Sequence, residues 1–589
     1  MADVIQERPL RIIEKEAKAV QVERLWLKFL LLGAVLLAVW LPRGLALDRF
    51  ATPDEAAWVG RSASFYHALL HRDFAATFQH SHPGVTATWA GAVSFRYHYP
   101  GLASQVEART LKNWERVEPF LRERGYQPVQ ILETARAFMV LGTTAALGAA
   151  WFYALRLLGL WPALVGLLLV AFDPFHAGLT RLLHLDGLAG SLMLASCLAF
   201  LAFVYRGRRW FDLVLAAVLA GLAWLTKVPA LFLVPFFGLV MGIEVLRGWR
   251  KAGRLRGADI ARAAWPLLAL AGMSLLVFVL LWPAMWVDPL GTLSQIFSRS
   301  LSYAEEGHSS VIFFNGQVYA GDPGWSFYPV NYLWRTTPPV LFGLVLAGIA
   351  LLRGRVPRDR PEMRWVVLLL VLYAVLFGVG MSLAAKKFDR YLLPSFPALD
   401  LVAGFGWAAL LGWLWGAAPR PPVRLAGAAA VGLAVAWQLL LALQTAPYYL
   451  SYYNPLLGGS ERAPQVMMIG WGEGLDQAAR YLNTLPHASD LRVMSHYPDG
   501  SFSYFFEGET LHLPERWGGL ADEQLDGVDY LVLYIHQWQR QRPDPEMLAF
   551  FAAQTPEFVV RIDGLDYAQV YNLDDMAFSK SKALLFPTP

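Results

Sequence analysis

The stretch AWPLLALAGMSLLVFVLLWP, residues 264–283, runs without a charged side chain. A helix of about 20 apolar residues crosses the hydrocarbon core of a bilayer. Comparable runs predict further spans at 25–46, 131–155, 160–177, 183–204, 211–226, 229–247, 338–352, 365–384, 391–415 and 424–446. The sequence therefore predicts an all-α polytopic membrane protein with about 11 transmembrane helices.

The composition agrees with a membrane protein. Of 589 residues, 56% are hydrophobic and 16% are charged, whereas soluble domains carry about 25% charged residues. The single cysteine, Cys197, excludes an intramolecular disulfide. The net charge of +4 is typical of basic cytoplasmic loops, so we expect membrane lipids and no nucleic acid among the partners.

The distribution of Lys and Arg predicts the orientation. The positive-inside rule places basic loops in the cytoplasm. With eleven spans, the basic segments fall on one side, at 1–24, 206–209, 247–262 and 353–364. The transmembrane domain is then 25–446, in the plasma or inner membrane, with a cytoplasmic N-terminal segment 1–24. The loops 48–130 and 284–337 and the tail 447–589 lie outside the cytoplasm.

The tail has the pattern of a small extracytoplasmic α/β domain. Residues 474–483 and 545–554 have the pattern of helices, and 491–495 and 528–535 that of strands. A hairpin is predicted around Gly564.

Two adjacent carboxylates, Asp54 and Glu55, follow the first span. A carboxylate in such a place can accept the proton of an attacking hydroxyl, which makes both residues candidate catalytic groups. The alternative is that Asp54 caps the helix that follows.

Further charges stand at the outer ends of other spans. Ionisable side chains at membrane depth are costly and usually functional. Arg181, His184 and Asp186 end the third span and begin the fourth, where an interfacial cap with a snorkelling arginine is the alternative. Lys227 lies between two spans, as a phosphate contact or as a residue of the headgroup layer.

A cation cluster at 386–390 comprises Lys386, Lys387 and Arg390. Arginine binds phosphate in a bidentate manner and lysine supplies a point charge. We expect these cations to bind a lipid-linked phosphate, with phospholipid headgroups as the alternative ligand.

The loop 284–337 adds candidates for a substrate cleft and one for phosphate. His308, Trp325, Tyr328 and Arg335 stand among amides and turn residues, a mixture that suits sugar contacts but also ordinary loop packing. Four histidines near the carboxylates, His67, His71, His80 and His82, could hold a divalent ion, although their spacing matches no metal motif. No metal ligand and no certain cofactor are predicted, and no nucleotide-binding glycine loop is found.

Taken in order, these motifs resemble the bacterial branch of glycosyltransferase family 39, the protein O-mannosyltransferase-like enzymes of the C-type superfamily. The resemblance rests on PDE at 53–55, HPGVTATW at 82–89, RLLHLDG at 181–187, GLAWLTKVPAL at 221–231, GW and FYPV within 324–330, RTTP at 335–338, KKFDRYLLPSFP at 386–397, and YYLSYYNPLLGG at 448–459 followed by GWGEGL.

The resemblance implies a helical membrane enzyme that moves a sugar, such as mannose, from a polyprenyl phosphate to a hydroxyl outside the cytoplasm with inversion. Asp54 matches the general base, with Glu55 beside it. Arg390 and the neighbouring lysines match positions near the lipid phosphate, with Lys227 and Arg335 as further contacts. His82, Arg181, His184, Asp186, His308, Trp325 and Tyr328 are assigned to the substrate cleft.

The sequence also departs from this family. Eukaryotic members carry a β-trefoil insertion, which the loop 284–337 is too short to hold, and the first-loop motif reads HPG rather than HPP. The α/β tail resembles the lipid A aminoarabinose transferases. The acceptor is thus a protein, a lipid or a glycan. Competing hypotheses are a flippase for lipid-linked sugars, a ligase using pyrophosphate-linked donors, and a scaffold without catalysis.

Overall fold

The computed structural model of the chain describes residues 30–112, 117–305, 307, 310–355, 360–417, 421–513 and 527–573. The predicted cytoplasmic segment 1–24, the start of the predicted span 25–46 and His308 lie outside these ranges.

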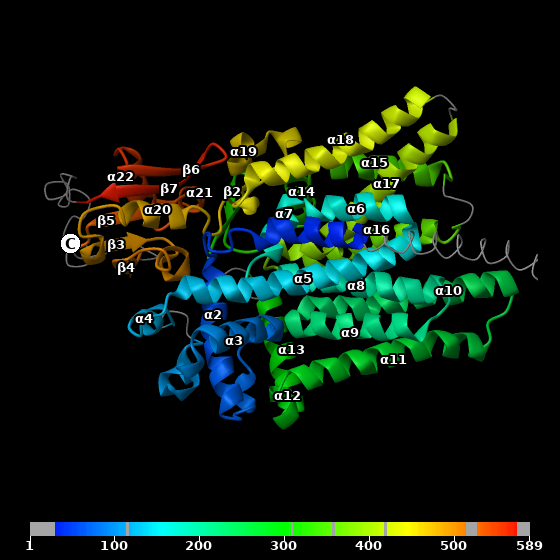
Figure 1. The fold of residues 1–589 in the computed structure, drawn as a ribbon, viewed down its shortest axis with the longest axis horizontal. Helices are drawn as coiled ribbons and strands as arrows, with labels where there is room; N and C mark the ends of the chain where they lie inside the picture. Colours follow the sequence, from blue (N-terminus) through cyan, green and yellow to red (C-terminus); the bar gives the residue numbers. More distant parts are fainter. Residues whose placement is uncertain are drawn as a thin grey trace, which may run out of the picture.

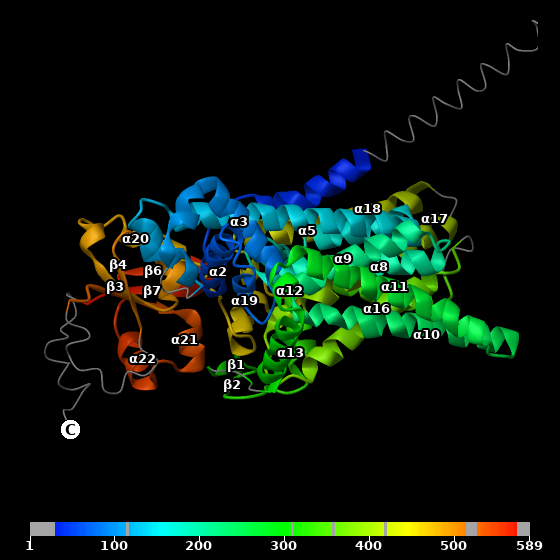
Figure 2. The same ribbon diagram turned by 90° about the horizontal axis from the view of Figure 1, so that it is seen from below.

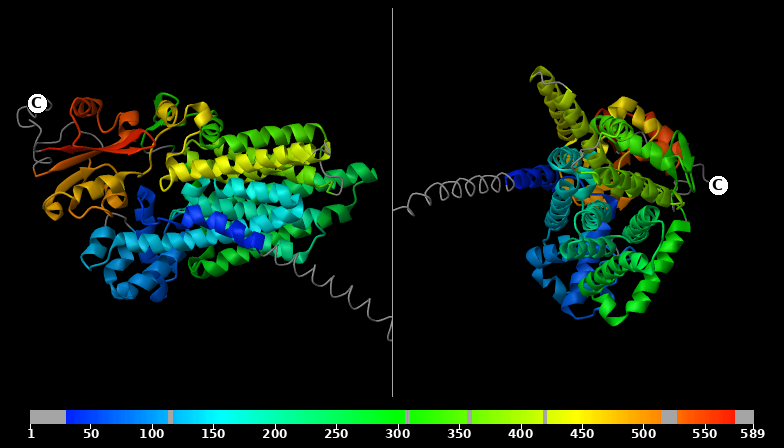
Figure 3. Two further views of the ribbon diagram at one scale, coloured as in Figure 1. Left: turned by 45° about the horizontal axis from the view of Figure 1, so that its top comes forward. Right: turned by 90° about the vertical axis from the view of Figure 1, so that its right-hand side faces the viewer.

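Apolar helices form a bundle, seen from the side in Figure 1 and along its length in the right-hand view of Figure 3. Its helices are Leu30–Gly44, α5 (Pro128–Leu158), α6 (Leu160–Ala171), α7 (Pro174–Thr180), α8 (Leu185–Tyr205), α9 (Trp210–Thr226), α10 (Leu233–Ala252), α11 (Gly257–Leu281), α14 (Phe327–Arg335), α15 (Pro338–Leu352), α16 (Met363–Ser382), α17 (Phe396–Ala417) and α18 (Pro421–Thr445).

Each predicted span overlaps one of these helices. Within the described residues, seven helices are long and apolar enough to cross a membrane alone. If each of two bent helix pairs, α6 with α7 and α14 with α15, counts as one span, the described residues hold up to nine. Leu30–Gly44 and α9 are apolar but shorter. The chain is therefore an integral membrane protein, and the count of eleven spans remains a prediction.

The helix α8 lies at the centre of the bundle: 94% of its most apolar 18-residue stretch is buried, compared with 22% for α11. Small residues allow this close packing. A Cβ added at Gly187 would lie 2.5 Å from the carbonyl oxygen of Leu179, and one at Gly190 would lie 3.3 Å from Pro394. The start of α8 is thus held against the segments 179–186 and 389–395, which carry several candidate site residues.

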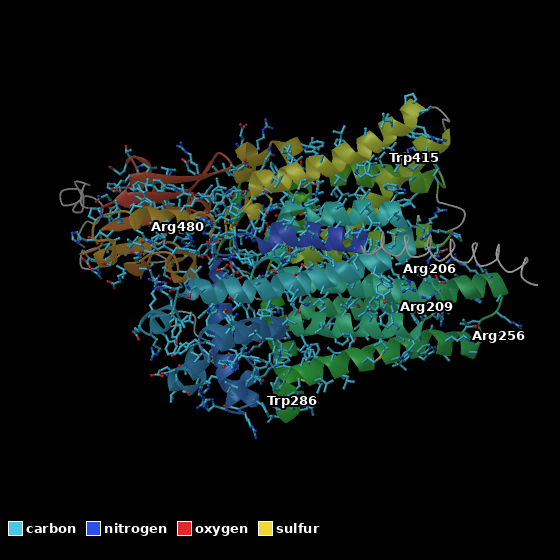
Figure 4. All side chains as sticks on the ribbon, in the orientation of Figure 1. Arg206, Arg209, Arg256, Trp286, Trp415 and Arg480 are labelled. Carbon is cyan, nitrogen blue, oxygen red and sulfur yellow. The ribbon has the colours of Figure 1, made fainter. Side chains whose placement is uncertain are left out.

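Short helices and a hairpin cover one end of the bundle. They are α2 (Pro53–Leu70), α3 (Val85–His98), α4 (Val117–Arg122), α12 (Ala284–Val287), α13 (Pro289–Glu305), β1 (Ile312–Phe314) and β2 (Gln317–Tyr319). Arg206, Arg209 and Arg256, from the basic loops, lie at the opposite end (Figure 4). These two basic loops and the covered end are thus separated by the length of the bundle, and which end faces the cytoplasm stays a prediction.

The tail forms a small α/β unit at the covered end (Figures 1 and 2). Its elements are α19 (Gly459–Arg462), α20 (Leu475–Leu482), β3 (Arg492–Ser495), β4 (Glu509–His512), β5 (Tyr530–Tyr534), α21 (Ile535–Arg540), α22 (Pro545–Ala552), β6 (Phe558–Ile562) and β7 (Leu565–Asn572). The predicted helices, strands and hairpin of the tail are confirmed. β4, α19 and α21 were not predicted.

The five strands make one mixed sheet in the order β4-β3-β5-β7-β6. β4, β3 and β5 run parallel, while β7 is antiparallel to both β5 and β6. Gly564, with a φ of +79°, makes the tight turn between β6 and β7.

The tail unit rests on α2 and α4. Arg122, at the end of α4, donates from Nη2 to the backbone carbonyls of Ser503 at 2.5 Å and of Phe506 at 2.7 Å. A Cβ added at Gly500 would lie 2.6 Å from Ala56 on α2. Buried residues of the bundle and of the sheet belong to one continuous apolar cluster. The tail therefore packs against the helix that begins with Asp54.

Candidate active site

The first turn of α2 presents Asp54. The helix begins at Pro53 and Thr52 is its capping residue. Proline suits this position because its fixed φ is helical and its missing N–H has no intrahelical partner to lose. The Thr52 N–H donates to the Glu55 carboxylate at 2.9 Å, as in a capping box. The alternative that Asp54 caps the helix is therefore wrong, because the helix starts one residue earlier.

Glu55 belongs to a buried ion pair. Arg136 of α5 donates from Nε to Oε1 at 2.7 Å and from Nη2 to Oε2 at 2.5 Å. The Leu183 N–H donates to Oε1 at 2.7 Å. Glu55 has no exposed surface, whereas the side chain of Asp54 is 42% exposed. The structure thus separates the two neighbouring carboxylates: Glu55 fastens α2 to α5 and to the turn before α8.

Asp54 meets the second predicted cluster through His184. His184 Nε2 lies 3.3 Å from Asp54 Oδ2, and its Nδ1 lies 3.3 Å from Asp186 Oδ2. Arg390 contacts the same two carboxylates, with Nη2 3.3 Å from Asp54 Oδ2 and Nε 3.6 Å from Asp186 Oδ2. Four residues from three distant parts of the sequence therefore form one charged cluster.

Lys227 completes this cluster. Its Nζ forms an ion pair with Asp186 Oδ1 and lies 4.3 Å from the centroid of the Tyr391 ring. Lys227 stands where α9 ends, with an extended backbone, so its side chain turns toward the start of α8. Two cations and two carboxylates thus balance in charge around His184.

The pKa of Asp54 reflects its neighbours. Burial alone would raise it, but the hydrogen bond with His184 and the charges of Arg390 and Arg61 outweigh burial and hold the pKa below its ordinary value of 3.8. The carboxylate is therefore ionised at neutral pH and can accept a proton or a hydrogen bond.

The other predicted phosphate contacts are paired as well. Arg335 Nη2 lies 2.8 Å from Asp389 Oδ2, and its Nη1 donates to the carbonyls of Leu450 and Tyr452. Lys387 is buried and forms an ion pair with Asp322. Lys386 is half-buried. Of the predicted cations, Arg335 and Arg390 line the cavity described next.

A cavity of about 630 Å³ opens beside Asp54. Its lining combines acidic, basic and apolar side chains: Pro53, Asp54, Ala57, Arg61, Phe175, Leu179, Arg335, Phe388, Asp389, Arg390, Leu450, Met468, Gly470, Trp471, Glu473 and Tyr497. A carboxylate and a guanidinium 3.3 Å apart thus share one cavity wall.

The remaining predicted cleft residues lie outside this lining where the structure describes them. His82 is half-buried in the loop before α3, where partial burial and the charge of Lys227 lower its pKa to about 3. Arg181 is buried and donates to the carbonyls of Leu45 and Ala46 at 2.5 Å. Tyr328 is buried and Trp325 is 61% exposed.

Among the lining residues that sequence reasoning did not single out are Arg61, Trp471, Glu473 and Tyr497. Arg61 lies seven residues after Asp54, two turns along the same helix, so helical periodicity could have identified it. The other three come from the tail. Their signal is the run GWGEG at 470–474, whose glycines indicate an unusual backbone path.

The four histidines near the carboxylates do not gather into a metal-ligand set in the part of the chain that the structure describes. His67 and His71 stack with ring centroids 4.1 Å apart. Among the described residues, no group of three or more His, Cys, Asp or Glu side chains is placed to hold a metal ion. Binding of a divalent ion by the four histidines therefore remains an untested hypothesis.

The fold of the chain is similar to the solved structures of two other proteins. No protein-family model and no curated protein matches the chain. ArnT from Cupriavidus metallidurans in the apo state has a TM-score of 0.47 at 16% identity, covering 93% of this chain and 98% of that one. Its structure bound to undecaprenyl phosphate has a TM-score of 0.46 at 16% identity, covering 92% and 97%. The apo oligosaccharyltransferase of Archaeoglobus fulgidus has a TM-score of 0.46 at 12% identity, covering 86% and 70%.

Proposed function

We propose that this membrane protein is an inverting glycosyltransferase that moves a sugar from a polyprenyl-phosphate carrier to an acceptor hydroxyl. One observation carries the proposal: Asp54 and Arg390 line the same cavity, 3.3 Å apart, at the covered end of an apolar helical bundle. A base for a hydroxyl and a cation for a phosphate are the two groups that this reaction needs.

In the proposed step, the acceptor oxygen attacks the anomeric carbon as its proton passes to the Asp54 carboxylate. The bond between the anomeric carbon and the phosphate oxygen breaks, and its electron pair stays on the phosphate. Attack from the side opposite the leaving group inverts the anomeric configuration. Asp54 is the better candidate for the base than Glu55, whose two oxygens already accept from Arg136, Leu183 and Thr52.

The leaving phosphate gains negative charge and needs cations more than a strong acid. Arg390 is the first candidate because it already lies on the cavity wall. Lys227 reaches the same cluster through Asp186. We propose that both cations rearrange toward the phosphate when the donor binds, with Arg335 as a further contact on the cavity wall and with Lys386 and Lys387 as outer contacts. Cations preorganised at the site of developing charge typically provide a large share of catalysis.

Our proposals for the sugar and the acceptor rest on the sequence motifs, not on the shape of the cavity. We propose a hexose such as mannose, because the motif order resembles protein O-mannosyltransferases. The α/β tail also fits the alternative of an aminoarabinose-transferase-like enzyme with a lipid acceptor. We place the reaction on the extracytoplasmic side, because the basic loops lie at the other end of the bundle (Figure 4).

The test is a transfer assay with purified protein in detergent. Polyprenyl-phosphate mannose labelled in the sugar is incubated with protein and lipid acceptors, for the wild type, Asp54→Asn and Asp48→Asn. Asp48 is a matched control, because it is an exposed outer carboxylate paired only loosely with Arg49 at 3.9 Å. We expect Asp54→Asn to lose about 10²–10⁴-fold in transfer rate and Asp48→Asn to keep it.

The outcomes separate the hypotheses. Label that moves to protein or to lipid identifies the acceptor class. If mannose stays on the carrier, polyprenyl-phosphate aminoarabinose is tested next. If neither donor is consumed, and protein reconstituted into lipid vesicles moves the labelled donor across the membrane, the flippase hypothesis replaces this one. Equal rates for Asp54→Asn and the wild type refute the assignment of the base.

A further inference from the structure

A loop of the tail reaches into the cavity. Gly470, Gly472 and Gly474 alternate with Trp471 and Glu473, and all three glycines have positive φ, at +88°, +106° and +85°. A Cβ added at Gly472 would lie 2.4 Å from the carbonyl oxygen of Ala51. Glycine is required there by both φ and space. The loop is therefore pressed against the chain just before Asp54.

The sheet holds this loop in place. Tyr534, at the end of the central strand β5, accepts from the Gly472 N–H at 3.0 Å and donates to the Glu473 carboxylate at 3.2 Å. Glu473 also accepts from the Trp471 N–H at 2.5 Å and is 1% exposed. Buried polar groups that are satisfied in this way make a rigid support.

The loop carries Trp471 to the charged cluster. The indole meets the His184 ring edge to face, with centroids 5.1 Å apart and an interplanar angle of 90°. The guanidinium of Arg390 lies 4.2 Å from the centroid of the indole ring. An arginine over a tryptophan face is attracted by the ring's negative face. Trp471 thus touches the two residues that contact Asp54.

We infer that Trp471 is a positioning residue through which the tail domain holds Arg390 and His184 in place against Asp54. The inference rests on the proposed function for its kinetic consequence, but the contact itself can be tested without turnover. The tail is then part of the active site, in addition to any role in docking the acceptor.

The experiment compares Trp471→Ala and Trp471→Phe with Trp538→Ala. Trp538 is a matched control, because it packs against the smaller apolar cluster of the same domain and lies outside the cavity lining. Two readouts are taken on the full-length protein: transfer kinetics with the labelled donor, and the rate at which phenylglyoxal modifies Arg390, followed by peptide mass spectrometry. Arg390 is only 12% exposed, so the reagent reports on its release.

We expect Trp471→Ala to lower kcat/KM about 10-fold or more, mainly through a higher KM for the donor, since a cation–π contact and the placement of the phosphate-binding cation are both lost. Modification of Arg390 is expected to become several-fold faster. Trp471→Phe retains an aromatic face and is expected to recover most of both readouts. Trp538→Ala leaves both unchanged.

The inference is overturned if phenylglyoxal modifies Arg390 in Trp471→Ala at the wild-type rate, or if Trp538→Ala reproduces every effect of Trp471→Ala. If the wild type transfers no sugar while Trp471→Ala still accelerates modification of Arg390 and Trp538→Ala does not, the proposed function fails and the positioning role stands.

Discussion

Replacing Glu55 by glutamine separates a structural carboxylate from a catalytic one. Glu55 and Arg136 form an ion pair whose side chains are 0% and 1% exposed, so water does not screen it. The substitution leaves the Arg136 guanidinium buried with its charge uncompensated. Breaking a buried pair in this way costs about 3–5 kcal/mol, which is larger than most single substitutions cost. We therefore expect a marked loss of thermal stability.

The assay is thermal unfolding of purified protein in detergent, followed by size-exclusion chromatography, beside the transfer rate per folded molecule. Glu55→Gln is expected to melt well below the wild type while the molecules that remain folded still transfer sugar. Asp54→Asn is expected to show the reverse, because its partly exposed carboxylate supports less of the fold. The double variant Glu55→Gln, Arg136→Met removes both charges and is expected to recover part of the stability.

The opposite pattern would refute the reasoning. If Glu55→Gln melts with the wild type but its folded molecules no longer transfer sugar, the buried carboxylate takes part in the chemistry. If the double variant is less stable than Glu55→Gln, an unpaired Arg136 charge is not the cause of the loss.

Three further outcomes are expected. Lys227→Gln raises the KM for the donor about 10-fold or more, and Lys227→Arg, which keeps the charge, recovers part of it; equal KM values for Gln and wild type would contradict a phosphate contact. Because the pKa of Asp54 lies below 3.8, its carboxylate stays charged above about pH 4, and the stability it contributes is lost only as the pH falls through that lowered pKa. We therefore expect the transfer rate to stay constant from pH 7 to about pH 5. A fall in rate near pH 6 that disappears in Asp54→Glu would contradict this expectation. Gly472→Ala places a methyl group against the Ala51 carbonyl oxygen at a residue whose φ is +106°. We expect it to cost about 1–3 kcal/mol of stability and to lower the transfer rate, as measured by the same thermal unfolding and transfer assays. An unchanged stability and rate would show that the loop can move aside.

Much of the fold could be predicted because its signals are local. An apolar run such as 264–283 needs no knowledge of the rest of the chain to indicate a span. The hairpin around Gly564 is likewise encoded within fifteen residues or so. The bends between α6 and α7 and between α14 and α15 also have a local signal, since α7 begins at Pro174 and α15 at Pro338, but proline alone does not predict their angles of 66° and 112°.

The sequence predicts at which membrane side the site residues gather, but it does not predict which of them contact one another. Asp54, Asp186 and Arg390 stand at outer ends of predicted spans, and ends on one side of a membrane share a layer. Which of the two adjacent carboxylates enters the cavity depends on Arg136, a residue far along the chain whose partner the sequence does not reveal. Trp471 was missed for the same reason, because only the packing of the sheet brings its loop to the cavity.

The cavity wall runs in sequence from Pro53 to Tyr497, and this order has a consequence for biogenesis. The first wall residues emerge early in synthesis, whereas the last ones follow α18. With the proposed orientation, in which the cavity lies outside the cytoplasm, the segment 447–497 has to cross the bilayer before the wall can close. A nascent chain halted before that step would hold Asp54 and Arg390 without the part of the cavity wall that residues 468–497 supply, so the proposed reaction would begin only after full insertion.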